Sequence, residues 1–357
     1  MILDIVRWGI LGAASIARRH AVPAINAVPE ARAVAVASRD INKAKAFAAE
    51  LGIERAYGNY EALLGDTDID AVYIPLPNHL HLQWIEKALQ AGKHVLCEKP
   101  LGLQAVDVRL IMQWAQAAQR LVVEGVTSYF NPIHEQAAQL IKAGDVGELR
   151  FISISLGWSF ADKPDDFRWR PEQGGGALYD IGGYCISTAR RLAGREPEQV
   201  TAVARYRSES GRDDGRGAGD GPCAGDGRCV GHDHDVDTDM AVMLTFSHGL
   251  NALIDFSLLS AFRNEYTAIG SSGKLTVEMP FGNGAARRTI RLWDVRGGSA
   301  GKCAVDAHQM QAQFRAVSQA IASGGPSPLP LTESLANAVI LDACRSSAQA
   351  GGCCVRL

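Results

Sequence analysis

Near the start of the chain, residues 8–17 read Trp8-Gly9-Ile10-Leu11-Gly12-Ala13-Ala14-Ser15-Ile16-Ala17. The apolar run that ends at Leu11 predicts a buried strand, and the helical spacing of apolar residues from Ser15 onward predicts a helix. Gly12, Ala14 and Ala17 match the spacing G-x-G-x-x-G/A, in which a strand-to-helix turn presents backbone amides to a pyrophosphate. Alanine at the second glycine position adds only one methyl group. Taken alone, the motif also fits a tight turn that binds no ligand.

Outward from this motif, residues 5–124 alternate short apolar runs with longer helical patterns. Such alternation indicates βαβ units and a parallel sheet covered by helices on both faces. We therefore expect a doubly wound α/β domain of the Rossmann type over residues 1–124. Its strands are expected at Ile5–Leu11, Ala33–Ala37, Asp70–Leu76, His94–Cys97 and Leu121–Glu124.

From about residue 149 the pattern changes, because residues 152–156 alternate large apolar with small side chains. This alternation predicts strands with one buried face, and short turns between such strands predict antiparallel hairpins. We expect an α+β domain with an open, mainly antiparallel sheet over 125–357. The hairpins are expected at 241–247 with 250–258 and at 266–270 with 274–278, and the closing helices at 308–323 and 332–349.

The composition is that of an ordinary globular protein. The chain has 357 residues, of which 47% are hydrophobic and 21% charged, and its formal net charge is −3. The length predicts two domains, and the composition excludes a mainly disordered chain. We expect no nucleic-acid partner, signal peptide or membrane span, because no basic stripe and no long apolar run is present. The eight cysteines are scattered, which favours reduced thiols in a cytoplasmic protein.

One segment, about 208–235, fits neither domain, since 14 of the 25 residues from 211 to 235 are glycine or aspartate. We expect an inserted surface loop. Its possible zinc ligands are spaced unlike those of structural zinc sites, so we predict no metal site. These side chains are Cys223, Cys229, His232 and His234.

The tip of the second expected strand indicates which nicotinamide cofactor is bound. Ser38-Arg39 stands where an NAD-binding domain carries a carboxylate. Asp40 follows and is expected to cap the next helix. Because a guanidinium matches a phosphate in geometry and charge, we expect NADP to be preferred, with NAD as the alternative.

Two further segments carry groups suited to proton transfer. Lys99 follows a strand and is expected at the carboxyl edge of the sheet, where a merely solvated lysine would also fit. Asp180 and Tyr184 lie four residues apart in a helical pattern and would share one face. The alternative is that Asp180 caps the helix and Tyr184 is a core residue. A phenol beside an ammonium ion loses its proton readily, so Lys99 and Tyr184 together suit an alcohol substrate.

With these motifs in this order, the chain resembles the glucose–fructose oxidoreductase, inositol dehydrogenase and MocA superfamily, Gfo/Idh/MocA. The resemblance covers nearly the whole chain. Where many members have histidine four residues after the acid, this chain has Tyr184, as in the branch of glucose–fructose oxidoreductase, NADP-dependent xylose 1-dehydrogenase and dimeric dihydrodiol dehydrogenase. The matching segments are residues 8–14, Pro77-Asn78-His79-Leu80-His81, Ala91-Gly92-Lys93-His94-Val95-Leu96-Cys97-Glu98-Lys99-Pro100 and Gly174-Gly175-Gly176-Ala177-Leu178-Tyr179-Asp180.

The resemblance implies an NADP-dependent oxidoreductase of a sugar, polyol or dihydrodiol. Lys99 and Tyr184 would handle the proton, and Asp180 would orient the substrate. A homodimer or larger homo-oligomer is expected through the outer face of the second sheet. Residues expected at the cofactor are Gly12, Ala14, Ser15, Ile16, Ser38, Arg39, Leu76, Asn78, His81, Glu98, Lys99, Trp169 and Arg170.

Two alternatives to a dehydrogenase stay open at this point. A lyase-like or hydrolytic relative would use bound nicotinamide only transiently, and a regulator would bind the dinucleotide without catalysis. The presence of Lys99, Asp180 and Tyr184 favours the dehydrogenase, because a regulator needs no proton-transfer groups. The substrate itself is not readable from the sequence.

Overall fold

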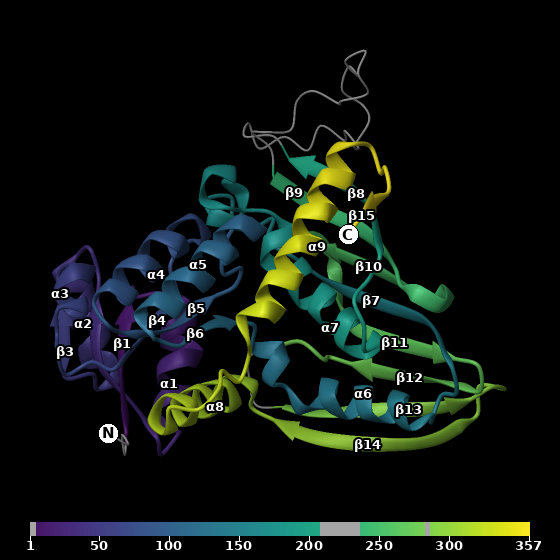
Figure 1. Ribbon diagram of the computed structural model, residues 1–357, viewed down its shortest axis with the longest axis horizontal. Coiled ribbons are helices and arrows are strands. Elements are labelled where there is room, and N and C mark those ends of the chain that lie inside the picture. Colours follow the sequence, from purple (N-terminus) through teal and green to yellow (C-terminus); the bar gives the residue numbers. More distant parts are fainter. Residues whose placement is uncertain (1–4, 208–235, 283–285) are drawn as a thin grey trace, which may run out of the picture. The chain divides into compact units, whose positions relative to one another are not determined.

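The computed structural model describes residues 5–207, 236–282 and 286–357 (Figure 1). The chain forms two compact units, each of which combines two segments of the sequence. Unit 1 comprises the residues up to Phe130 together with His308–Ala336, and unit 2 comprises Asn131–Ala307 together with Asn337–Leu357. The insert expected at 208–235 lies outside the described residues.

Unit 1 contains a parallel sheet of six strands in the order β3-β2-β1-β4-β5-β6. This is the strand order of a doubly wound dinucleotide-binding fold, so the fold class expected for the first domain is confirmed. The short β3 was not expected, because its three residues form no apolar run. The strands are β1 (Val6–Leu11), β2 (Ala31–Ala37), β3 (Arg55–Tyr57), β4 (Ala71–Ile74), β5 (His94–Glu98) and β6 (Val122–Gly125). The helices are α1 (Val22–Asn26), α2 (Ile41–Leu51), α3 (Tyr60–Leu64), α4 (His81–Gln90), α5 (Ala105–Ala118) and α8 (Gln309–Ser323).

Helix α8 differs from the expected domain organisation, in which every residue after 124 belonged to the second domain. Its apolar stripe packs on the sheet of unit 1. The ring of Phe314 meets the ring of Trp8 edge-on at a centroid distance of 5.2 Å, and the Trp8 indole donates to Ser318 Oγ at 3.1 Å. An amphipathic pattern shows that one face of a helix is buried, but it does not show which sheet buries it.

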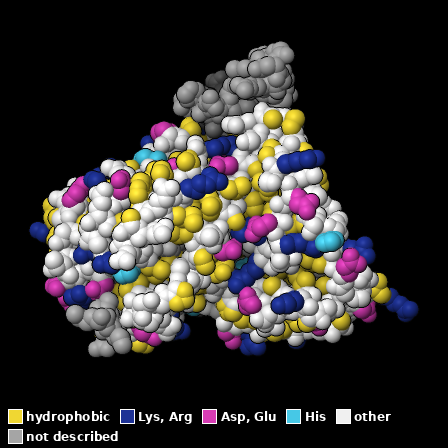
Figure 2. All heavy atoms as spheres, in the orientation of Figure 1, with side chains coloured by type: hydrophobic (Ala, Val, Ile, Leu, Met, Phe, Trp, Pro, Cys, Tyr) yellow, Lys and Arg dark blue, Asp and Glu magenta, His cyan; other side chains and the backbone are white. Residues whose placement is uncertain are grey.

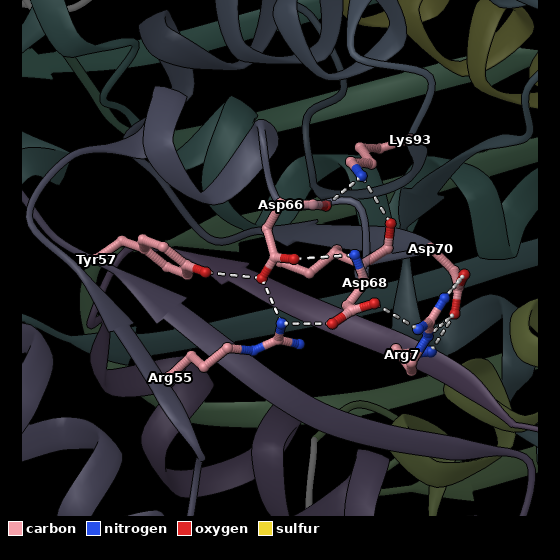
Figure 3. A network of polar contacts seen from close by, with 8 residues as sticks. Arg7, Arg55, Tyr57, Asp66, Asp68, Asp70 and Lys93 are labelled. Atoms are coloured by element: carbon pink, nitrogen blue, oxygen red, sulfur yellow. Dashed lines mark hydrogen bonds and ion pairs between the residues drawn. The ribbon is translucent and has the colours of Figure 1, made fainter.

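A polar network holds the segment that leads into β4, at the amino edge of the sheet (Figure 3). The guanidinium of Arg7 donates to the Asp70 carboxylate at 2.9 and 3.0 Å. The buried ammonium of Lys93 donates to the carbonyl oxygens of Asp66 and Ile69 at 2.6 and 2.8 Å. Burial by itself would raise the pKa of Asp70, but the hydrogen bonds from Arg7 outweigh it and hold that pKa below its usual value.

Unit 2 contains a sheet of nine strands in the order β14-β13-β12-β11-β7-β10-β9-β8-β15. The pair β10 and β7 is parallel, and the other described pairs are antiparallel. The mainly antiparallel sheet is confirmed, as are the hairpins β9–β10 and β11–β12. The strands are β7 (Leu149–Ser159), β8 (Gln199–Arg207), β9 (Val236–Thr245), β10 (Asn251–Ser257), β11 (Leu259–Gly270), β12 (Gly273–Glu278), β13 (Ala286–Asp294), β14 (Ser299–Ala307) and β15 (Val355–Arg356). The helices are α6 (Pro132–Ala143), α7 (Gly183–Ala193) and α9 (Leu331–Gln349), the last of which begins in unit 1.

The two faces of this second sheet differ in burial. Ile152, Ile154 and Leu156 of β7 are fully buried in a core that also contains residues of α6, α7 and α9. The residues that alternate with them point to the other face, where several apolar side chains are exposed. These are Val203, Met243, Leu253 and Ile269.

The surface carries charges of both signs. On the face in view in Figure 2, Lys and Arg side chains are interspersed with Asp and Glu side chains. Within residues 5–207, 236–282 and 286–357, no helix is long and apolar enough to cross a membrane. The same ranges contain no group of three or more His, Cys, Asp or Glu side chains placed to hold a metal ion.

Candidate active site

Most of the residues expected at the site lie at the carboxyl edge of the parallel sheet in unit 1. The residues at or just after the carboxyl ends of β2, β1, β4 and β5 are, in sheet order, Ser38 and Arg39, Gly12, Leu76 and Asn78, and Glu98 and Lys99. The strand order reverses between β1 and β4, which is where open α/β sheets bind their ligands. Unit 1 therefore brings the glycine turn after β1 and the lysine segment after β5 to one edge of the sheet. Only β4 lies between these two strands.

The turn after β1 has the shape that a dinucleotide phosphate requires. Gly12 has φ +118°, which favours glycine, and a Cβ atom there would lie 2.9 Å from Leu76 Cδ2. The following helix starts at once, since the Arg18 amide donates to the Ala14 carbonyl at 3.0 Å. The amides of the first helical turn point out of the helix N-terminus, where they and the helix dipole favour an anion. These residues fit the pyrophosphate of a nicotinamide cofactor.

Two charged residues, Arg39 and Asp40, follow the tip of β2. The Asp40 carboxylate is engaged in hydrogen bonds, whereas the Arg39 guanidinium is exposed. Asp40 caps α2 as expected, because its Oδ1 accepts the amides of Asn42 and Lys43 at 2.8 and 3.4 Å. The side chain of Arg39 is exposed, and within the described residues it makes no ion pair or hydrogen bond. A free cation beside an occupied carboxylate fits a 2′-phosphate better than a bare ribose.

His81 is fixed by two main-chain carbonyl groups of unit 1. It was expected among the cofactor-binding residues, but its side chain is fully buried at the start of α4. Its Nδ1 lies 2.8 Å from the Pro100 carbonyl oxygen, and its Nε2 lies 2.8 Å from the Leu76 carbonyl oxygen. Burial lowers the pKa of His81, although both carbonyls favour the protonated ring. The ring supports the turn after Lys99, and its contact with the cofactor stays a prediction.

Glu124 supports the same turn and was missed by the sequence analysis. It lies on β6, beside Cys97 of β5, and its Oε1 accepts the Leu101 amide at 3.0 Å. Burial raises the pKa of Glu124, and the positive charge of Lys99 opposes that rise. The available signal was an acidic residue at the end of an otherwise apolar strand, where a buried carboxylate needs a partner.

In unit 2, three glycines shape the entry into the helix that carries Asp180. A Cβ atom on Gly175 would lie 2.5 Å from the Arg168 carbonyl oxygen, so only glycine fits this close approach. Asp237 accepts the Leu178 amide at 2.6 Å and thereby caps the helix. Burial raises the pKa of Asp237 to about 6. The alternative that Asp180 is the helix cap is therefore wrong.

Asp180 and Tyr184 lie on one continuous helix, which opens with a π-helical turn at Leu178–Gly182 and continues as α7. The buried carboxylate of Asp180 accepts from Arg168 Nε at 2.7 Å. Tyr184 is half-buried, and its ring centroid lies 6.4 Å from that of Phe281. Arg168 was not expected at the site, because an arginine in a loop has no periodic pattern that marks its partner.

Trp169 and Arg170, also expected at the cofactor, lie in unit 2. The Trp169 indole is buried and donates to the Lys163 carbonyl at 2.9 Å, and the Arg207 guanidinium lies 4.7 Å from its ring centroid. Arg170 is exposed. Their contact with the cofactor stays a prediction.

The chain combines a Rossmann sheet of the dinucleotide-binding type with a mixed sheet, against which a helix with Asp180 and Tyr184 packs. This combination is typical of a class of nicotinamide-dependent oxidoreductases. Residues 6–126 match the family model described as an oxidoreductase family with an NAD-binding Rossmann fold, and residues 134–276 match the GFO/IDH/MocA C-terminal domain. The chain belongs to the Gfo/Idh/MocA oxidoreductase family, which confirms the resemblance seen in the sequence.

Among curated relatives, the chain is 34% identical to dTDP-3,4-didehydro-2,6-dideoxy-alpha-D-glucose 3-reductase of Actinomadura kijaniata, with 96% of each chain covered. It is 35% identical to D-xylose 1-dehydrogenase (NADP(+)) 2 of Haloferax volcanii, over 77% of this chain and 76% of the relative. Among solved structures, it matches KijD10, a 3-ketoreductase from Actinomadura kijaniata in complex with NADP and TDP-benzene. That match has a TM-score of 0.83 and 33% identity and covers 96% of this chain and 98% of the other.

Proposed function

We propose that the protein is an NADP-dependent oxidoreductase that transfers hydride between nicotinamide and a carbon of a sugar, polyol or related alcohol. In this proposal Lys99 and Tyr184 handle the hydroxyl proton, and Asp180 orients the substrate. Membership of the oxidoreductase family supports the reaction class. The names of a xylose dehydrogenase and a sugar-nucleotide 3-ketoreductase among the relatives support a sugar-like substrate.

The observation that carries the proposal is the arrangement of the carboxyl edge in unit 1. The glycine turn follows β1 and Lys99 follows β5, and only β4 separates these two strands. A strand spacing of about 4.8 Å brings the ends of β1 and β5 within about 10 Å of each other, which is within the span of a nicotinamide dinucleotide. The exposed Arg39 at the tip of β2 supports NADP over NAD.

The chemistry balances with groups of this chain and one cofactor. When bound, NADP accepts the hydride from the alcohol carbon or, as NADPH, returns it to a carbonyl. In the oxidative direction we expect Lys99 and Tyr184 to take up the hydroxyl proton as general acid–base groups. The Asp180 carboxylate accepts a hydrogen bond from a neighbouring hydroxyl and so selects which carbon is presented.

The test is an assay of purified protein with aldoses, polyols, sugar nucleotides and trans-dihydrodiols, each with NADP and with NAD. Lys99→Ala and Tyr184→Phe should each lower kcat by about 10²- to 10⁴-fold while the Kd for NADPH stays within a few fold. Two matched controls should keep kcat. Tyr179→Phe removes a phenol from the same helix, and Lys87→Ala removes a half-buried lysine of α4 that pairs with Glu61.

Three outcomes would overturn the proposal. Near-normal kcat in Tyr184→Phe would assign the proton to another group. Turnover without any net change in the absorbance of reduced nicotinamide would favour a lyase-like or hydrolytic relative, and dinucleotide binding without turnover on the whole panel would favour a regulator.

A further inference from the structure

Arg168 lies between two carboxylates of unit 2, one of which belongs to Asp180. Its Nε donates to Asp180 Oδ2 at 2.7 Å, and its Nη1 donates to Asp166 Oδ1 at 3.0 Å. The Arg168 side chain is 22% exposed and that of Asp180 is 8% exposed, so water screens this pair weakly. Charge-assisted contacts at this burial are stronger than those on an open surface.

Two aromatic rings lie close to the guanidinium of Arg168. Its Cζ lies 4.5 Å from the ring centroid of Phe160 and 4.8 Å from that of Phe167. Cation–π contacts of this kind favour a charged side chain and limit the planes in which it can lie. The aromatic contacts and the two carboxylate contacts together restrain the guanidinium.

The backbone of Arg168 is fixed as well. Its carbonyl oxygen accepts the Gly176 amide at 2.9 Å, just before the helix that carries Asp180. Gly175 has no Cβ, which allows its backbone to pass close to the same carbonyl oxygen. Main chain and side chain of one residue thus contact the same helix start, which is the arrangement expected of a residue that sets the position of another.

We propose that Arg168 is a positioning residue for the reaction, one that holds the Asp180 carboxylate charged and in a single orientation toward the substrate. This inference rests on the proposed function, in which Asp180 orients the substrate. An uncharged residue at 168 would remove the positive charge of Arg168 from the buried Asp180, which shifts the balance toward the protonated acid. A protonated Asp180 is a poorer acceptor for a substrate hydroxyl.

The experiment measures kcat/KM against pH for Arg168→Met, Arg168→Lys and wild type, with the best substrate of the panel. In Arg168→Met, the pH below which kcat/KM falls (the acid limb of the profile) should rise by about one unit or more. At neutral pH, kcat/KM should fall at least about tenfold. The Kd for NADPH should stay within a few fold. Arg168→Lys keeps the positive charge but lacks the planar guanidinium that can donate to two carboxylates at once. It should therefore recover part of the loss in kcat/KM.

Asp166→Asn is the matched control, because it removes the other carboxylate of Arg168 and keeps an oxygen to accept the Arg168 amide. It should leave the acid limb in place. If it moves the limb as far as Arg168→Met does, the effect belongs to the loop as a whole, and the inference is wrong. An unchanged limb and unchanged kcat/KM in Arg168→Met would overturn it equally.

Two further variants keep the outcome readable. If thermal unfolding shows that Arg168→Met is not folded, Arg168→Gln replaces it, because glutamine keeps hydrogen-bonding groups without the charge. Asp180→Asn separates this inference from the proposed function. Full activity in Asp180→Asn would refute the role proposed for Asp180, whereas loss in Asp180→Asn with normal Arg168 variants would refute only the positioning role.

Discussion

The Nδ1 atom of His81 lies 2.8 Å from the carbonyl oxygen of Pro100, the residue that follows Lys99. The other ring nitrogen lies 2.8 Å from the carbonyl oxygen of Leu76, whose side chain packs against Gly12. One buried ring therefore connects the segment beside the glycine turn with the segment that carries the lysine. Since both segments follow neighbouring strands, a shift of this ring would move the lysine relative to the cofactor turn.

Replacing His81 with phenylalanine should lower both stability and turnover. The ring keeps its approximate size, but the buried carbonyls lose their polar partner, which costs about 1–3 kcal/mol in the free energy of unfolding. We expect kcat to fall because the turn after Lys99 is held less firmly. Urea unfolding and steady-state assays measure the two effects. His79→Phe alters an exposed histidine of the same segment and should change stability by less than about 0.5 kcal/mol. Equal behaviour of the two variants would show that the ring of His81 only fills space.

Replacing Arg39 with aspartate should reverse the preference between NADP and NAD. The variant loses the guanidinium suited to a 2′-phosphate and gains a carboxylate suited to ribose hydroxyls. The ratio of kcat/KM for the two cofactors measures the change. Lys43→Asp, which makes the same charge change at an exposed position of α2, should keep the wild-type ratio. Equal or better kcat/KM of the wild type with NAD would contradict the assignment.

The fold was largely predictable because apolar runs and turn glycines are local signals. The Gly12 turn and the hairpins β9–β10 and β11–β12 follow from spacing alone. The sheet against which α8 packs was not predictable, because the contact between Phe314 and Trp8 joins residues some three hundred positions apart. The β3 strand was missed because it is held by β2 and not by its own pattern.

The sequence could suggest candidate site residues only where a recognisable segment marks them. Lys99 and Tyr184 stand in recognisable segments, whereas Arg168, Glu124 and His81 act through contacts with residues that no spacing rule connects. Buried polar side chains must find partners, so the structure shows these pairs at once. The sequence shows only that each residue is polar.

Replacing Asp70 with asparagine should lower stability at neutral pH and flatten its decrease in acid. The pKa of Asp70 is held below its usual value, so its contribution is complete above about pH 4 and is lost as the pH falls through the folded-state pKa. The loss at pH 7 should be about 1–3 kcal/mol, because Arg7 then keeps only the exposed carboxylate of Asp68 as a charged partner. Unfolding in urea at several pH values measures it. Asp68→Asn, whose carboxylate also meets Arg7 but is 66% exposed, should have little effect. Parallel pH curves for Asp70→Asn and wild type would contradict the prediction.

The outer face of the second sheet should join copies of the chain into a homodimer or larger homo-oligomer. On this face Met243 lies directly opposite Leu253 on the neighbouring strand, and both side chains are more than 40% exposed. An apolar strip on an open sheet face is stabilised when a second copy covers it. Leu253→Glu should therefore shift the mass in light scattering toward the monomer at micromolar protein, because it buries a charge at the interface. Val295→Glu, at a turn where the side chain is 74% exposed, should leave the mass unchanged. A monomer mass for the wild type would remove the prediction altogether.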